Sequence, residues 1–128
     1  MRSFKRIIVI ASVMLAVLAS SFAMAESTAA IKQMATIMHR LKHYPSPQGK
    51  EELKQVIANS ATTEREKVLA NAILNLEHMV ADADKPKLEK IMNDSAASAD
   101  EKDLAKIIYN LSHRPTDEDK ERLSKMMK

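Results

Sequence analysis

Histidine is the residue in this sequence best suited to bind a metal ion, and three of the four histidines are evenly spaced. His43, His78 and His113 lie 35 residues apart. Imidazole is the most common metal ligand among side chains, but a histidine in the last turn of a helix also bonds carbonyl groups that lack a partner. The sequence favours this structural role, because equivalent residues of stacked helices lie roughly 8 to 10 Å apart, too far to share one ion.

The fourth histidine offers a different metal site. His39 and His43 are four residues apart and would share one face of a helix, where two imidazoles can hold one transition metal ion. Met34 and Met38 would add soft sulfur atoms to the same helix, although both are read more simply as core residues. A His/Met metal-binding protein is therefore an alternative, and the primary expectation is that no metal or other cofactor is bound.

Other catalytic groups are scarce. The chain has no Cys and one Gly, which excludes thiolate metal sites, cysteine nucleophiles and a glycine-rich phosphate loop. Neighbouring carboxylates occur at Asp82 and Asp84 and at 117–119, but each group lies at the start of a predicted helix, where acidic residues stabilise the helix dipole. We expect that the protein is not an enzyme.

The first 25 residues have the three parts of a secretory signal peptide. Three basic residues within 2–6 precede an apolar segment at 7–19, and Ala-Met-Ala at 23–25 provides the small residues of a cleavage site. The 13 residues of the apolar segment are fewer than the roughly 20 that span a bilayer. We expect cleavage after Ala25, export to the periplasm or secretion, and no stable membrane anchor.

Removal of this segment changes the charge of the protein. The whole chain has 20 basic and 17 acidic residues, and the segment contains three basic and no acidic ones, which leaves 17 of each in 26–128. Both Phe residues are removed as well, so that two Tyr are the remaining aromatic residues. A neutral chain with few aromatic side chains lacks the charge and the stacking platforms that nucleic acid binding uses. We expect one domain at 26–128 without a nucleic acid partner.

This domain consists of three copies of a 35-residue unit, at about 28–62, 63–97 and 98–128. Lys67–Asn93 and Lys102–Lys128 are identical at 13 of 27 positions without a gap, which indicates duplication. Six columns have one residue type in all three copies. They are Lys32/Lys67/Lys102, Ala35/Ala70/Ala105, Leu41/Leu76/Leu111, His43/His78/His113, Lys50/Lys85/Lys120 and Leu53/Leu88/Leu123.

Each unit predicts two helices. Thr28, Thr63 and Ser98 are equivalent N-cap candidates, and in the last two copies a Glu three residues later completes a capping box. We expect a first helix of about 15 residues, which ends before Pro45 in copy one and before Pro115 in copy three. A second, shorter helix follows in each copy. The expected starts of these second helices are Ser46, Asp84 and Thr116.

The first helix of each unit has two non-polar faces. One carries a stripe for packing on the second helix of its own unit, and the other carries the repeated alanine, which lets a neighbouring helix approach closely. Two such faces are typical of stacked repeats. We therefore predict an all-α fold of three tandem helical hairpins, which form either a short α-solenoid-like stack or a compact bundle.

A third row of the first helix is the predicted partner-binding surface. Asn75 and Asn110 are equivalent and fall in the middle of the predicted helix, where Asn is a poor helix former. A repeated amide can bond the backbone of an extended peptide, and duplication of a solvated row explains it equally well. With Arg40 and Arg114, these residues form the predicted site. We expect an exported, non-catalytic protein that binds a protein or peptide, with an envelope chaperone or an inhibitor as alternatives.

Overall fold

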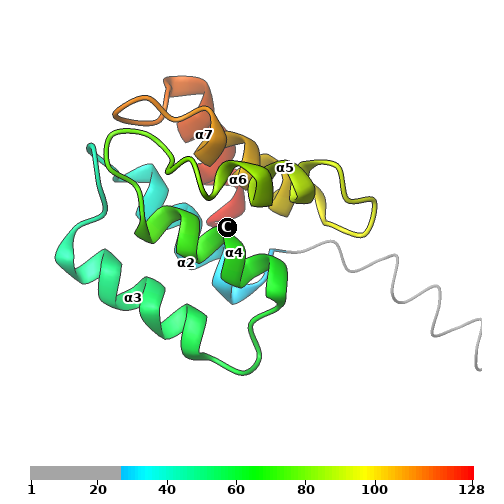
Figure 1. The fold of residues 1–128 in the computed structure, drawn as a ribbon. Helices are drawn as coiled ribbons and strands as arrows, with labels where there is room; N and C mark the ends of the chain where they lie inside the picture. Colours follow the sequence, from blue (N-terminus) through cyan, green and yellow to red (C-terminus); the bar gives the residue numbers. More distant parts are fainter. Residues whose placement is uncertain (1–26) are drawn as a thin grey trace, which may run out of the picture.

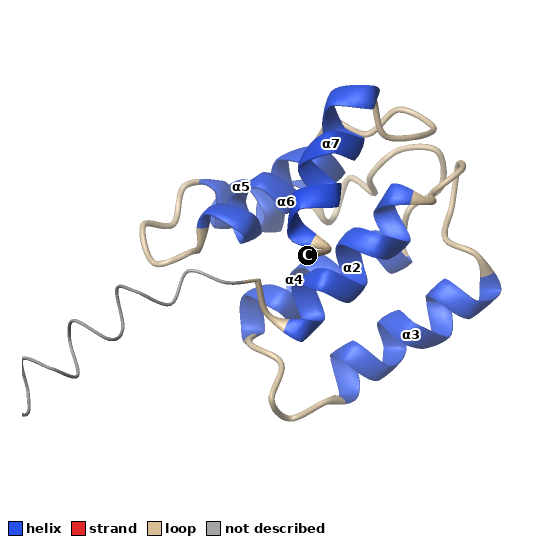
Figure 2. Cartoon of the chain, turned by 180° about the vertical axis from the view of Figure 1, so that it is seen from behind, coloured by secondary structure: helices blue, strands red, loops and turns tan. Residues whose placement is uncertain are grey.

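The computed structural model describes residues 27–128, so that the predicted signal segment lies outside the described residues. Residues 27–128 form six helices and no strand (Figure 1). The helices are α2 (Ala29–His39), α3 (Pro47–Ala58), α4 (Glu64–Leu74), α5 (Lys85–Met92), α6 (Ala99–Tyr109) and α7 (Asp117–Met126). Short loops join them (Figure 2). The prediction of an all-α fold is confirmed, and no helix in this part of the chain is long and apolar enough to cross a membrane.

Side-chain caps fix where five of the six described helices begin, as predicted. The Thr63 hydroxyl accepts from the Glu66 N–H at 3.2 Å, and the Glu66 carboxylate accepts from the Thr63 N–H at 2.9 Å. Such a cap is worth about 1 kcal/mol, because it satisfies N–H groups that have no partner within the helix. The other expected N-caps also directly precede a helix. Thr28, Ser46, Ser98 and Thr116 each accept a hydrogen bond from the first turn, whereas Asp84 begins α5 without a side-chain cap.

The first helix of each repeat ends earlier than predicted. α2, α4 and α6 have 11 residues each, not about 15, and a loop follows. α4 ends at the equivalent position although Val80 replaces the proline in that copy, so the proline is not what stops these helices. The leucine directly after each C-cap is buried, because the chain turns there to fill the core. These leucines are Leu41, Leu76 and Leu111.

The three repeats form a closed ring of helices. The second helix of each repeat packs most extensively on the first helix of another repeat, α3 on α4, α5 on α6 and α7 on α2. The first helices α2, α4 and α6 also pack on one another in the middle of the bundle. The prediction that each first helix packs mainly on the second helix of its own repeat is therefore wrong. Because α7 covers α2, the fold is a compact bundle and not an open stack.

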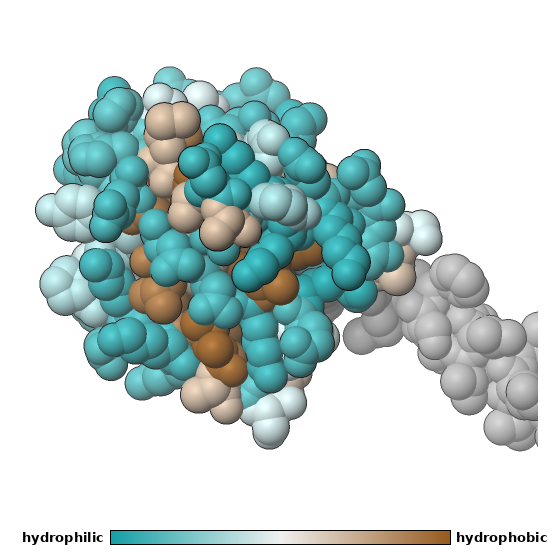
Figure 3. All heavy atoms as spheres, viewed as in Figure 1, coloured by the Kyte–Doolittle hydropathy of each residue, from teal (hydrophilic) through white to brown (hydrophobic). Residues whose placement is uncertain are grey.

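The repeated apolar columns form the core of this bundle. Ala35, Ala70 and Ala105 are completely buried on the three helices that meet in the middle, where a methyl group permits close approach. Met34 and Met38 are completely buried as well, which confirms their interpretation as core residues. Outside the core, the face shown in Figure 3 is largely hydrophilic, with hydrophobic residues visible in a band between α3 and α4.

Candidate metal centre

The loops that follow α2, α4 and α6 meet at one end of the bundle and bring the repeated histidines together (Figure 1). The N–H of His43 donates to the carbonyl of His113 at 2.6 Å, and the N–H of His78 donates to the carbonyl of His43 at 2.6 Å. The N–H of His113 donates to the carbonyl of His78 at 2.7 Å and closes the ring. Three backbone hydrogen bonds therefore hold three loops from distant parts of the sequence in an approximately threefold arrangement.

The backbone of each of these histidines is left-handed. The φ angle is 71° at His43, 66° at His78 and 68° at His113. At His43 this angle belongs to a tight γ-turn, in which the N–H of Tyr44 donates to the carbonyl of Lys42 at 2.8 Å. A residue with a Cβ pays roughly 1–2 kcal/mol for such a φ, and glycine is the usual choice. The protein instead places an imidazole at all three positions, and an unusual backbone of this kind points to a functional site.

The three imidazole rings converge on one point. Nδ1 of His78 lies 3.0 Å from Nδ1 of His43 and 3.2 Å from Nδ1 of His113. All three side chains are exposed to solvent. A single ring nitrogen carries either a hydrogen or a lone pair, so three Nδ1 atoms that face one another cannot all form hydrogen bonds among themselves. A cation at the centre would satisfy all three lone pairs at once.

The spacing of the Nδ1 atoms suits a transition metal ion. An ion about 2.0 to 2.1 Å from each nitrogen holds its nitrogen ligands about 3.0 Å apart in octahedral geometry and about 3.4 Å apart in tetrahedral geometry. The two separations that involve His78, 3.0 and 3.2 Å, fall in this interval, and all three ligand nitrogens lie within 4.8 Å of one another. We call His43, His78 and His113 the histidine triad. Within residues 27–128, no other cluster of three or more His, Cys, Asp or Glu side chains is close enough to hold an ion.

The structure corrects both sequence-based interpretations of the histidines. The separation of 8 to 10 Å assumed a linear stack, whereas ring closure places the three equivalent residues at one point. The histidines also lie beyond the helix ends, so they do not cap a last turn. The alternative pair fails for the same reason, because α2 ends at His39 and His43 is not on its next turn. The signal in the sequence was a histidine at the same position of all three repeats. These histidines come together only because the three repeats close into a ring.

The predicted partner-binding residues all lie at the triad end of the bundle. Arg40, Asn75 and Asn110 are equivalent C-caps, so the premise that the Asn residues are mid-helix is wrong. The Asn110 side chain donates to the carbonyl of Lys106 at 3.1 Å, and the Asn75 side chain donates to the Asp84 carboxylate at 3.2 Å. The repeated Asn is therefore explained by hydrogen bonds that its side chain makes near the end of its helix. Arg114, the fourth predicted residue, directly follows His113 and is exposed.

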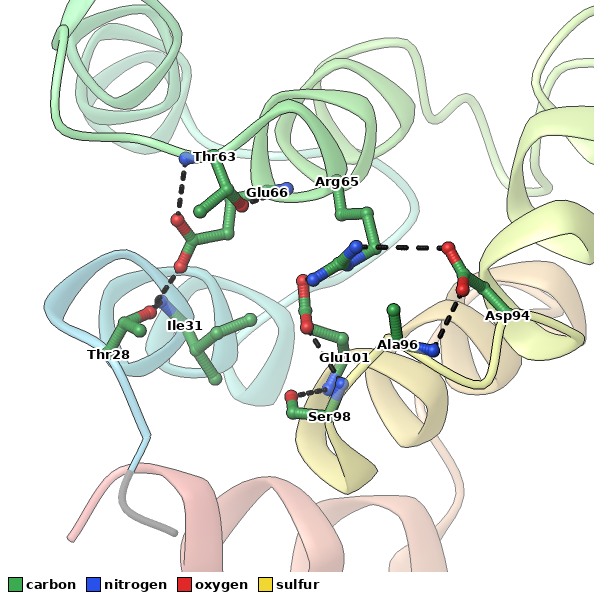
Figure 4. A network of polar contacts seen from close by, with 9 residues as sticks. All are labelled: Thr28, Ile31, Thr63, Arg65, Glu66, Asp94, Ala96, Ser98 and Glu101. Carbon is green, nitrogen blue, oxygen red and sulfur yellow. Dashed lines mark hydrogen bonds and ion pairs between the residues drawn. The ribbon is translucent and has the colours of Figure 1, made fainter. Parts of the chain in front are cut away.

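A polar network at the other ends of α2, α4 and α6 fixes how these helices are placed (Figure 4). The Glu66 carboxylate is 3% exposed and accepts from the hydroxyl of Thr28 in the preceding repeat, in addition to the N–H of Thr63. The Arg65 guanidinium donates to the Glu101 carboxylate of the next repeat at 3.0 Å. The Thr28–Glu66 and Arg65–Glu101 contacts join neighbouring repeats. The network therefore helps to hold the three helices that carry the triad in one relative position.

Two clefts open beside the triad. The larger, of about 580 Å³, is lined by residues of α2, the following loop and α3, and includes His43 and Tyr44. The second, of about 460 Å³, includes Tyr44 and His78. Tyr44 and Met79 directly follow triad residues and are 56% and 55% exposed, and in the described part of the chain they are the large hydrophobic side chains most open to solvent.

Comparison of the chain with protein-family models, with curated protein sequences and with solved structures finds no match. The geometry of the triad and its surroundings is therefore the basis from which a function follows.

Proposed function

We propose that this protein is an exported, non-catalytic protein that binds a divalent transition metal ion through His43, His78 and His113. The observation that supports this function is the convergence of three imidazoles, with Nδ1 of His78 at 3.0 and 3.2 Å from the other two Nδ1 atoms and all three ligand nitrogens within 4.8 Å of one another. Imidazole nitrogen favours Zn²⁺, Cu²⁺, Ni²⁺ and Co²⁺ over Ca²⁺ and Mg²⁺, which prefer oxygen ligands. The signal-like segment at 1–25 supports the proposed export.

The backbone around the triad favours tight binding. The ring of hydrogen bonds between the three histidines orders the loops through the fold itself, so an arriving ion has little ordering entropy to overcome. The ion also uses all three ring nitrogens as acceptors at once, which hydrogen bonds between these nitrogens cannot do. The left-handed backbone at the three histidines lowers the stability of the folded protein. Metal binding by the imidazoles is a reason for histidine, and not glycine, at these positions.

Calorimetric titration of the protein without its first 25 residues tests this function. We expect one ion of Zn²⁺, Co²⁺, Ni²⁺ or Cu²⁺ per chain. Replacement of any one triad histidine by alanine is expected to weaken binding more than about 100-fold, because loss of an outer-shell partner alone costs 10- to 100-fold. His39→Ala is the matched control, since His39 is the one histidine outside the triad, and it is expected to leave the Kd unchanged within about twofold.

A further measurement follows from the same site. A metal at 100 times its Kd should raise the free energy of unfolding by about 2.7 kcal/mol. Absence of heat with all four ions, or equal losses in His39→Ala and His78→Ala, would contradict the proposed function.

A second candidate is the protein- or peptide-binding function predicted from the sequence, which includes the chaperone and inhibitor alternatives. The exposure of Tyr44 and Met79 beside the triad favours it, because exposed hydrophobic side chains are common in binding surfaces. Capture of envelope proteins by the tagged protein, compared with a Tyr44→Ala/Met79→Ala variant, tests this role. Equal recovery by both proteins would remove this surface from consideration, and suppression of aggregation of unrelated clients would identify a chaperone.

A further inference from the structure

We propose that the metal-loaded protein binds a small carboxylate anion, which occupies the larger cleft beside His43 and completes the coordination of the metal. This inference rests on the proposed metal binding. It assigns a ligand class to the part of the coordination sphere that the protein leaves open.

The triad supplies fewer ligands than these ions take. The triad offers three nitrogen ligands, whereas zinc takes four ligands and the octahedral ions take six. No other His, Cys, Asp or Glu side chain of residues 27–128 joins this group. The three histidines are exposed, so the open side of the ion faces solvent. At least one coordination position must therefore be filled from outside the described chain.

The larger cleft borders the triad at His43 and carries cationic groups. Its volume is about 580 Å³, within the range of small-molecule sites, and His43 forms part of its wall. Arg40, Lys42 and Tyr44 also line it, and Glu52 is the acidic residue of the lining. A guanidinium binds a carboxylate through two parallel hydrogen bonds. The ammonium and the phenol add further donors.

This cationic wall is specific to the first repeat. Arg40 is replaced by Asn in the other two repeats, and Lys42 is replaced by Glu77 and Ser112. The second cleft, beside His78, therefore has a carboxylate where the first has an ammonium group. Neutral imidazoles do not offset the two positive charges of a bound ion, so metal binding makes the whole face more favourable for an anion. The first cleft is the one whose own charge adds to this attraction.

Cobalt provides the test, because its visible absorption reports on the ligands that it holds. The Co²⁺-loaded protein is titrated with acetate at constant ionic strength, and acetamide serves as the neutral analogue of nearly equal shape. We expect a saturable change in the cobalt bands with acetate and none with acetamide. Arg40→Gln and Lys42→Gln are each expected to weaken acetate binding at least about fivefold, while the affinity for Co²⁺ stays unchanged. Arg122→Gln, at an exposed ion pair on α7, is the matched control and is expected to change neither.

Each other result has a defined meaning. If Co²⁺ binds but acetate leaves the bands unchanged, the carboxylate site is refuted and the metal site stands. Equal acetate affinity in Arg40→Gln, Lys42→Gln and the parent protein would place the anion outside this cleft, which also refutes the inference. A metal-dependent dimer in sedimentation, with bands indifferent to acetate, would show that a second copy fills the open position. Failure of Co²⁺ to bind would instead refute the proposed function.

Discussion

Glycine at position 78 is expected to give a more stable metal-free protein than alanine at the same position, which reverses the usual order of these two residues in helices. The φ of 66° at His78 is left-handed, which costs a residue with a Cβ roughly 1–2 kcal/mol and costs glycine almost nothing. Glycine loses about 0.5–1 kcal/mol through its greater freedom in the unfolded chain. The difference leaves the glycine variant more stable by about 0.5–1 kcal/mol. Both substitutions remove the imidazole, so its lost contacts cancel in the comparison.

Urea unfolding in the presence of EDTA, followed by circular dichroism, measures this difference. In thermal unfolding, the same gain corresponds to roughly 2 to 8 °C in Tm for a domain of about this size. Asn75 provides the matched control, because its φ of −88° is accessible to alanine, and there the glycine variant should not be the more stable one. If the alanine variant at position 78 is as stable as the glycine variant or more stable, the left-handed backbone does not have the energetic cost that we infer. Both variants at 78 should lose metal binding.

Three further predictions concern the fold around the site. Glu66→Ala should lower the free energy of unfolding by about 2–3 kcal/mol, because the buried Glu66 carboxylate accepts hydrogen bonds from two N-cap residues, Thr28 and Thr63. In the same urea assay, Glu64→Ala should change the free energy of unfolding by less than about 0.5 kcal/mol, because the Glu64 side chain is 91% exposed. Equal losses in the two variants would contradict a stabilising role for the network. Leu88→Ala should cost about 2–5 kcal/mol, because Leu88 is completely buried, and a cost below about 1 kcal/mol would contradict its place in the core. The Tyr109 hydroxyl donates to the Glu89 carboxylate at 2.7 Å, and this bond and the charge of Glu89 raise the pKa of Tyr109 above its ordinary value of 10.0. Glu89→Gln should therefore lower that pKa in an absorbance titration at 295 nm, and an unchanged titration curve would refute the contact. Because the folded pKa is the higher one, the stability from this contact is present below the unfolded pKa and is lost as the pH rises through the folded pKa.

The starts of the helices could be predicted from the sequence because they depend on local chemistry. Thr63 and Glu66 are three residues apart, and their mutual hydrogen bonds need no distant partner. The N-cap at Ser46, followed by Pro47, is local in the same way. The buried alanine column followed from periodicity alone, because it requires only that the first helix has two apolar faces.

The ends of the first helices and the triad could not be predicted in this way. The stop before Leu76 carries no proline or glycine and depends on the core into which that leucine turns. The closure of α7 onto α2 depends on the angle between successive repeats, which no residue pattern states. A small change in that angle separates an open stack, with distant histidines, from a ring in which they touch. The position of the triad therefore follows from the topology and not from any motif.

The packing of α7 on α2 also has a consequence for how the chain folds. Within residues 27–128, α2 is paired with α7, the helix farthest from it along the sequence, so the apolar side of α2 has no cover until α7 has been synthesised. Such a non-local pairing slows folding and leaves a nascent chain exposed to aggregation. The loops that carry the imidazoles are drawn together at the same moment, so a truncated or incompletely folded product has no assembled site with which to capture metal.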